Sequence, residues 1–117
     1  MTLNVLLYLV SDTSDNEHSH EATEVYTGKI ENILTGIAIE SSLYDPIWDP
    51  SSLGAVQASD LIEHLQKGID ILIKERKYFS YLEPRSKKGT SEDLLQFAKE
   101  YLAACKDFPV AKIEVKR

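Results

Sequence analysis

Cysteine, tryptophan and methionine each occur only once in this chain of 117 residues, and its 13 basic residues are outnumbered by 19 acidic ones. The single cysteine, Cys105, excludes an internal disulfide and is typical of a reducing compartment. The net charge of -6 disfavours nucleic acid and anionic membranes as partners. The apolar run 3–10 is too short to cross a bilayer and lacks the flanks of a signal peptide. We therefore expect a cytoplasmic protein that binds neither nucleic acid nor membrane.

What the chain does contain is ordinary for one globular domain. Its 43% apolar and 27% charged residues predict a single domain over residues 1–117. The polar stretch 11–22 has nothing to bury, so we expect a mobile loop there. It separates two apolar runs, 2–10 and 23–30, which we predict to be strands paired as a hairpin. Apolar residues on both faces of the first run indicate a strand covered on both sides, or a central one.

The clearest periodic pattern lies between Ala58 and Phe79. Seven apolar residues recur there at steps of three and four: Ala58, Leu61, Ile62, Leu65, Ile69, Leu72 and Ile73. The spacing predicts an amphipathic helix, and only Gly68 and Ile71 interrupt it. Each buried Leu or Ile contributes about 1.5–3 kcal/mol, so this stripe can anchor the core.

The segment before this helix is less regular. Residues 34–44 have helical spacing weakened by Gly36, and we expect a short helix there. Prolines follow Asp45 and Asp49, which predicts an extended or turn segment between them. Trp48 lies in that segment, and we expect its ring to pack on the central helix.

Two further elements complete the chain. A capping-box sequence at 90–93 opens a helix whose apolar face ends at Cys105. Apolar residues then alternate with lysine and glutamate over 111–116, which is typical of a half-buried edge strand. The order of elements predicts an α+β fold. We expect a small antiparallel sheet of about three strands, with two main helices and one short helix packed on one face.

Two histidines in the polar stretch form the weaker candidate site. His18 and His20 are two residues apart, with carboxylates close by. In an extended segment these side chains have the ligand types that suit zinc or another divalent ion. No third ligand is set by the spacing, so we favour a polar loop that happens to contain two histidines. We expect no resident metal or other cofactor.

The concentrated positive patch lies just before the last helix. Glycine there lets the backbone approach a ligand, and the free N–H groups of a helix start attract phosphate or carboxylate. The spacing is not that of a P-loop, and a solvated loop is the alternative. With two aromatic residues as contacts, the predicted ligand site comprises Arg85, Lys87, Lys88, Gly89, Thr90, Tyr44 and Trp48.

No constellation for nucleophilic catalysis is present in the sequence. Cys105 lies on an apolar helix face, where we expect a buried thiol of low reactivity. His64, between Leu61 and Leu65, is expected at the margin of the core. The chain has no Gly-x-Ser-x-Gly, Cys-His-Asn or His-Glu-x-x-His pattern, so we expect no enzymatic activity.

Aromatic, glycine and proline landmarks run through the C-terminal part of the chain. They are Tyr44-x-x-x-Trp48-x-Pro50, Gly54, Ala58-x-x-Leu61-Ile62-x-x-Leu65-x-x-Gly68, Phe79, Pro84, Gly89-Thr90, Tyr101-Leu102-x-Ala104-Cys105 and Pro109. In these the chain resembles a family of small uncharacterised proteins encoded by phages and prophage-bearing bacteria. The family has Asn-Gly-Trp-Gly where this chain has Ser86-Lys87-Lys88-Gly89, and Asn-Ile-Thr-x-Asn where it has Lys29-Ile30-Glu31-Asn32-Ile33. The resemblance implies a phage setting but no activity, because the family has none assigned. If the departing positions line the family's site, they imply a different ligand for this chain.

Three functions follow in order of preference. The first is a small non-enzymatic binding protein, a phage accessory factor that sequesters an anionic nucleotide-like molecule in conflict with host defence. The alternative is a protein-partner module, an immunity- or antitoxin-like inhibitor whose acidic residues, such as Asp60, Glu63 and Asp70, meet a basic toxin or host protein. A metal-dependent hydrolase using His18 and His20 ranks third. An exposed edge strand is compatible with a homodimer, although no specific residue indicates one.

Overall fold

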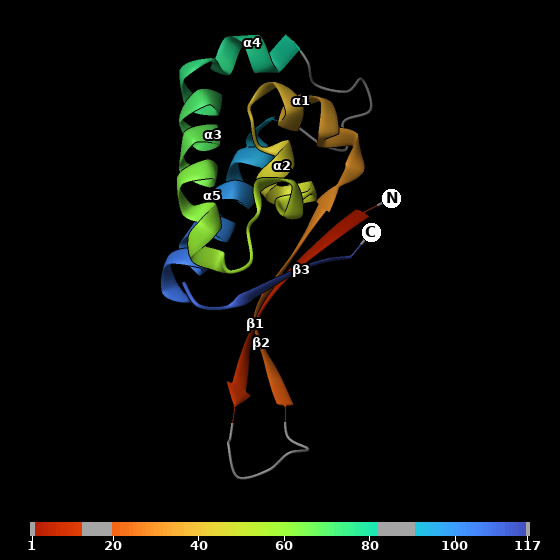
Figure 1. Ribbon diagram of the computed structural model, residues 1–117. Coiled ribbons are helices and arrows are strands. Elements are labelled where there is room, and N and C mark those ends of the chain that lie inside the picture. Colours follow the sequence, from red (N-terminus) through yellow and green to blue (C-terminus); the bar gives the residue numbers. More distant parts are fainter. Residues whose placement is uncertain (1, 13–19, 82–90, 117) are drawn as a thin grey trace.

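A computed structural model describes residues 2–12, 20–81 and 91–116 (Figure 1). Within them, three strands form one antiparallel sheet in the order β2-β1-β3. The strands are β1 (Thr2–Asp12), β2 (His20–Glu31) and β3 (Lys112–Lys116). The predicted α+β fold is therefore confirmed, and β1 is the central strand.

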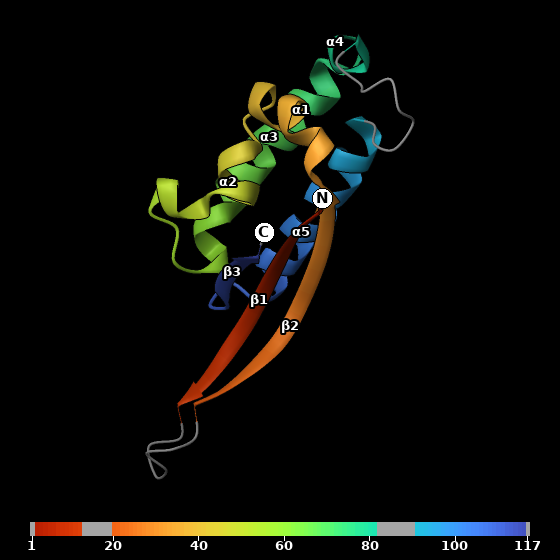
Figure 2. The same ribbon diagram turned by 90° about the vertical axis from the view of Figure 1, so that its right-hand side faces the viewer.

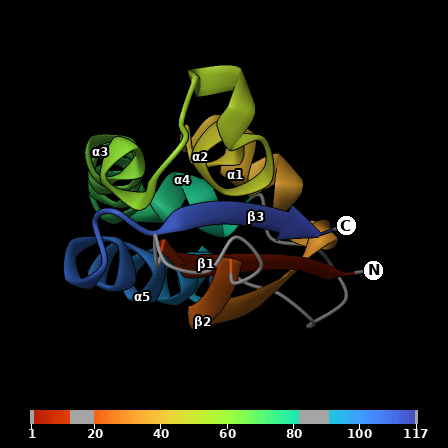
Figure 3. The ribbon, with the colours of Figure 1, turned by 60° about the horizontal axis from the view of Figure 1, so that its bottom comes forward.

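The helices lie on one face of this sheet (Figures 1 and 3). The two main ones, α3 and α5, pack against each other. In chain order the helices are η1 (Asn32–Leu34), α1 (Thr35–Glu40), α2 (Tyr44–Trp48), η2 (Pro50–Leu53), η3 (Ala58–Leu61), α3 (Ile62–Lys74), α4 (Arg76–Tyr81) and α5 (Ser91–Asp107). The predicted layering of helices on one sheet face is thus observed.

The alternation of β1 places its odd-numbered residues against the helices. Leu3, Val5 and Leu7 are fully buried. Leu6 and Tyr8 point to the opposite face and are only half-buried. This is the pattern of an antiparallel sheet with one face covered, because successive side chains point to opposite faces.

The predicted central helix is divided into three parts. Residues 58–61 form a 3-10 turn, α3 follows, and the chain breaks at Glu75 before α4. Leu65, Ile69 and Leu72 are buried as predicted, but Ile73 is 50% exposed. The placement of Ile73 on the buried stripe was therefore wrong, because α5 covers a narrower arc of α3 than the apolar spacing implied.

Gly68 interrupts the apolar stripe because the turn before α2 passes very close to α3 at this position. A Cβ atom at Gly68 would lie 2.3 Å from Cδ2 of Leu43 and 3.2 Å from the carbonyl oxygen of Ser41. Leu43 is fully buried. Only the absence of a side chain at position 68 lets the turn before α2 pack so close to the helix.

The proline-flanked segment is helical rather than extended, so that part of the prediction was wrong. Pro46 lies in the first turn of α2. Proline is tolerated there because a backbone N–H in the first turn has no acceptor within the helix. The preceding Asp45 is itself in the helix. Asp49 does leave helical geometry, with φ −143° and ψ 62°, as expected for a residue before proline.

The hairpin of β1 and β2 extends further than predicted. Ser11 pairs with Glu21 and Asp12 with His20, so the polar loop predicted for 11–22 is strand at both ends. Residues 13–19 lie outside the described residues. Backbone pairing continued because the ladder does not require apolar side chains. Residues 9–12 and 20–24, which we call the arm, project from the body in Figures 1 and 2.

Candidate functional site

Most of the predicted ligand site lies outside the described residues. This applies to Arg85, Lys87, Lys88, Gly89 and Thr90, and α5 begins directly after them at Ser91. His18 also lies outside, and of His20 only the backbone is described, as the first residue of β2. Among the described residues, no group of three or more His, Cys, Asp or Glu side chains is arranged to hold a metal ion.

The two aromatic residues of the predicted site are stacked on each other. The rings of Tyr44 and Trp48 are nearly parallel, at 3°, with centroids 5.7 Å apart. Trp48 is 3% exposed, and its indole N–H donates a hydrogen bond of 3.0 Å to Oδ1 of Asn32. Trp48 is therefore a core residue that supports Tyr44 from behind. Tyr44 is half-buried and keeps part of its ring accessible.

Tyr44 lies in a cleft between α2 and α3, which we call the α2–α3 cleft. Its volume is about 250 Å³. Its walls come from α1, the following turn, α2, η2 and α3, and the lining residues are Ile39, Ser42, Tyr44, Asp45, Pro46, Leu53, His64 and Lys67. The cleft thus brings together polar side chains from two parts of the chain about twenty residues apart.

The turn between α1 and α2 shapes this cleft. Ser42 has φ 65°, in the left-handed region that residues with a side chain seldom adopt. The backbone N–H of Leu43 donates to the carbonyl of Ala38 at 2.8 Å, and the hydroxyl of Ser41 donates to the same carbonyl at 3.2 Å. These bonds tighten the reversal, so that α2 is directed back across α3 at Gly68.

The groups in the cleft are suited to an anionic ligand that also carries N–H donors. Lys67 supplies a cation, and His64 is an exposed imidazole one turn earlier on the same helix. The carboxylate of Asp45 accepts hydrogen bonds, and the ring of Tyr44 offers a surface for stacking. A nucleotide combines all three needs in an aromatic base, amino or imino donors and a phosphate.

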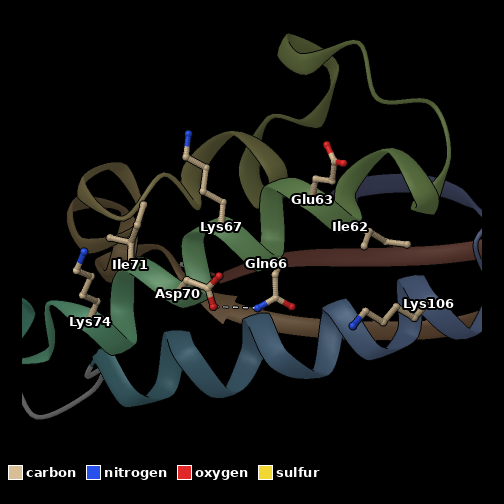
Figure 4. A pocket seen from close by; sticks show the side chains of 8 residues that line it. All are labelled: Ile62, Glu63, Gln66, Lys67, Asp70, Ile71, Lys74 and Lys106. Carbon is tan, nitrogen blue, oxygen red and sulfur yellow. Dashed lines mark hydrogen bonds between the residues drawn. The ribbon is translucent and has the colours of Figure 1, made fainter.

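Lys67 also borders a second, shallower depression on the outer face of α3. Figure 4 shows its lining side chains, of which seven come from α3 and one, Lys106, from α5. The side chains of Ile62 and Ile71 form its apolar part, and Nε2 of Gln66 donates to Oδ1 of Asp70 at 3.0 Å. Its volume is about 570 Å³. The cleft therefore opens toward a lysine-bearing surface.

Three groups with raised pKa values lie elsewhere: Tyr101 and Cys105 on α5, and Tyr26 on β2. Cys105 is fully buried, and burial raises the pKa of its thiol to about 12. It is therefore a protonated thiol at neutral pH, as the sequence predicted. The ring of Tyr26 stacks on Tyr101 with centroids 5.6 Å apart, and burial raises the pKa of Tyr26 to about 12. These rings fill the space between β2 and α5.

Sequence reasoning missed the polar members of the cleft. His64 was expected at the core margin, yet it is exposed, and Lys67 was not among the predicted site residues. The signal that could have identified them is their three-residue spacing beside Gly68, which puts them on one helix face next to a close approach. Comparison of the chain with known protein families, curated proteins and solved structures finds no match. The resemblance to phage-encoded proteins stays a prediction.

No helix of the described part of the chain is long and apolar enough to cross a membrane.

Proposed function

We propose that this chain is a small non-enzymatic protein that sequesters an anionic nucleotide-like molecule through the α2–α3 cleft. The observation that carries the proposal is the convergence of Tyr44, His64 and Lys67 on one cleft. The aromatic base stacks on Tyr44, its amino group donates to Asp45, and the phosphate lies beside Lys67 and His64. The resemblance to phage-encoded proteins supports a role against host signalling molecules.

The size of the cleft limits how the ligand is held. At about 250 Å³ it is smaller than the ~300–1,000 Å³ typical of sites that enclose a drug-sized ligand. We therefore expect one end of the ligand in the cleft and the phosphate end over α3, where Lys67 and Lys74 lie two turns apart on the outer face. The basic stretch 85–90 is the second candidate for the phosphate, and variants distinguish the two.

The first test is thermal unfolding of the purified chain with nucleoside phosphates, cyclic dinucleotides and ADP-ribose. A ligand at a hundred times its dissociation constant adds about 2.7 kcal/mol of stability, which raises the melting temperature. We expect Lys67→Ala and His64→Ala each to weaken binding about tenfold or more, since hydrogen bonds to charged groups contribute about 1.5–3 kcal/mol. The matched control is Lys29→Ala, an exposed lysine on β2 away from the cleft.

Two outcomes would contradict this assignment. A panel without any shift would reject the ligand class. A shift that survives Lys67→Ala but disappears in the Lys87→Ala/Lys88→Ala double variant would move the site to the basic stretch. Chromatography of the ligand after incubation tests the non-enzymatic part, because a sequestering protein returns it unchanged.

The protein-partner alternative is better tested by a charge reversal at Glu63 than at Asp60, although the sequence suggested both residues. Asp60 accepts the backbone N–H groups of Val56 and Gln57 at 3.0 and 3.2 Å, and these bonds lower the pKa of its carboxyl group. Reversing its charge would therefore disturb the start of η3 as well as the surface. Glu63 is exposed on the outer face of α3 and is the cleaner position for testing a basic partner.

A further inference from the structure

Among the described residues, Asp45 is the one acidic side chain that lines the α2–α3 cleft. It is exposed, and its carboxylate forms no hydrogen bond or ion pair with another described residue. An ionised carboxylate accepts hydrogen bonds at two oxygens and donates none. Both acceptors of Asp45 are therefore available to a ligand in the cleft.

Tyr44 precedes Asp45 on α2 and determines where an aromatic base lies. Its ring stacks on Trp48 with centroids 5.7 Å apart, and Trp48 is itself held by its hydrogen bond to Asn32. A base on the accessible part of the Tyr44 ring extends this stack, and every nucleobase has a π face that can do so. Stacking therefore holds a base without distinguishing one base from another, and the distinction depends on the polar groups at the base edge.

The base edge that best matches a carboxylate is the Watson–Crick edge of guanine. The N1–H and N2–H₂ donors lie side by side there, so each meets one carboxylate oxygen. Adenine and cytosine have a ring-nitrogen acceptor beside a single amino donor, and the lone pair of that acceptor opposes the second oxygen. Uracil has one N–H between two carbonyl acceptors. Of these four bases, guanine alone satisfies both oxygens of Asp45.

The cations of the cleft lie on the opposite wall, on α3. The Lys67 side chain points away from α5 (Figure 4), and it forms no ion pair with Asp45 although both residues line the cleft. His64 lies one turn before Lys67 on the same helix. The cleft thus keeps an acceptor on α2 apart from cations on α3. A guanine nucleotide has the matching polarity, with base donors at one end and a phosphate at the other.

We propose that the α2–α3 cleft binds guanine nucleotides and that Asp45 is the residue that distinguishes the base. Its carboxylate accepts N1–H at one oxygen and N2–H₂ at the other while the base stacks on Tyr44. This inference rests on the proposed function, because it names the base of the nucleotide-like ligand. Asp45 is exposed, so the discrimination is about tenfold to a hundredfold rather than the roughly 10⁴–10⁵-fold of a site whose polar groups are buried.

The test is isothermal titration calorimetry with the 5′-monophosphates of guanosine, inosine, adenosine and xanthosine. We expect the wild type to bind the guanosine nucleotide about tenfold or more tightly than the adenosine nucleotide, since hydrogen bonds to a charged group are the strong ones. The inosine nucleotide should fall between them, because it keeps N1–H but has no 2-amino group. Lys67→Ala should weaken the binding of all four by a similar factor, because the phosphate is common to them.

The decisive variant is Asp45→Asn. An asparagine side chain accepts at one position and donates at the other, which matches the N1–H and the C2 carbonyl of xanthine. We therefore expect Asp45→Asn to bind the guanosine nucleotide about tenfold or more weakly and to prefer the xanthosine nucleotide. Its melting temperature without ligand should be close to that of the wild type, because the carboxylate has no described partner to lose. Glu114→Gln, an exposed residue on β3, is the matched control and should keep the guanine preference.

Three contrary results are distinguishable. If the adenosine nucleotide binds as tightly as the guanosine nucleotide, and Lys67→Ala still weakens both, the base assignment is wrong while the proposed function holds. If the guanine preference survives Asp45→Asn, another residue distinguishes the base, and the inference about Asp45 is wrong. If none of the four nucleotides binds to the wild type, the inference is overturned, and the thermal-unfolding panel shows separately whether another nucleotide class binds.

Discussion

The two ends of β1 both contain apolar residues but have different surroundings. Residues 3–7 have β2 and β3 as neighbours and helices over one face, and Leu3, Val5 and Leu7 are fully buried. Beyond Tyr8 the strand pairs only with β2, and Val10 is 44% exposed. The comparison teaches that an apolar strand residue contributes to stability only where a second layer covers it.

The sharpest test of this difference compares one truncation in each region. Leu7→Ala should lower the free energy of unfolding by about 2–5 kcal/mol, because it removes buried methyl groups and leaves a cavity. Val10→Ala should change it by no more than about 0.5 kcal/mol, as exposed positions usually do. Urea unfolding of both variants measures the two changes in the free energy of unfolding. Equal losses would show that the arm is covered within one chain.

A second test concerns the close approach that holds the turn before α2 on α3. Gly68→Ala should destabilise the fold by about 1–3 kcal/mol, because the new methyl group overlaps Leu43 and overpacking outweighs the gain in helix propensity. In a Leu43→Ala background the same change should be neutral or stabilising. If Gly68→Ala is harmless in the wild type, the turn can move away from α3, and the shape of the cleft is then adjustable.

A third test concerns a buried polar group, on the covered side of the sheet, that is expected to lower the free energy of unfolding. Tyr101 is fully buried, and its hydroxyl has no hydrogen-bond partner among the described residues. A buried polar group without a partner costs about 1–3 kcal/mol. Tyr101→Phe should therefore raise the free energy of unfolding by about 1 kcal/mol in thermal or urea unfolding. Tyr26→Phe, in the half-buried stacking partner, is the matched comparison, and a loss of stability in Tyr101→Phe would reveal a partner for its hydroxyl.

The smallest effect is expected at the end of the molecule opposite the arm. Arg76 pairs with Glu92 and thereby links α4 to α5, and both side chains are more than half exposed. Exposed ion pairs contribute about 0–1 kcal/mol and are screened by salt. A double-mutant cycle of Arg76→Ala and Glu92→Ala at two salt concentrations measures the coupling. A coupling above about 2 kcal/mol that persists in high salt would mean that water is excluded from this contact.

Sequence periodicity predicted much of the secondary structure. The three strands, α3 and α5 were all located, and Cys105 was correctly placed in the core. Periodicity succeeded there because it records how each element divides its side chains between core and solvent. It failed at Ile73 and at Pro46, where the outcome depended on how much of a helix its neighbour covers and on where a proline falls in the first turn.

Of the residues that line the candidate cleft, the sequence predicted only Tyr44. Trp48, which was predicted with it as a ligand contact, lies in the core and stacks on Tyr44. His64, Lys67 and Asp45 belong to the same cleft because the turn at Ser42 folds α2 across α3. No spacing rule joins residues from separate elements, since their proximity depends on a turn with a left-handed residue and on one helix position without a side chain.

By itself, the amino-acid sequence determined where the three strands and the two main helices lie, most of the apolar face of each, and how unevenly charge is distributed along the chain. Those properties are local, because they follow from the repeat of one element or from simple composition. Only the tertiary structure decided that β1 and β2 extend past β3 as an arm and that a cleft forms between α2 and α3. These features depend on contacts between segments far apart in the chain, and the local sequence pattern does not indicate such contacts.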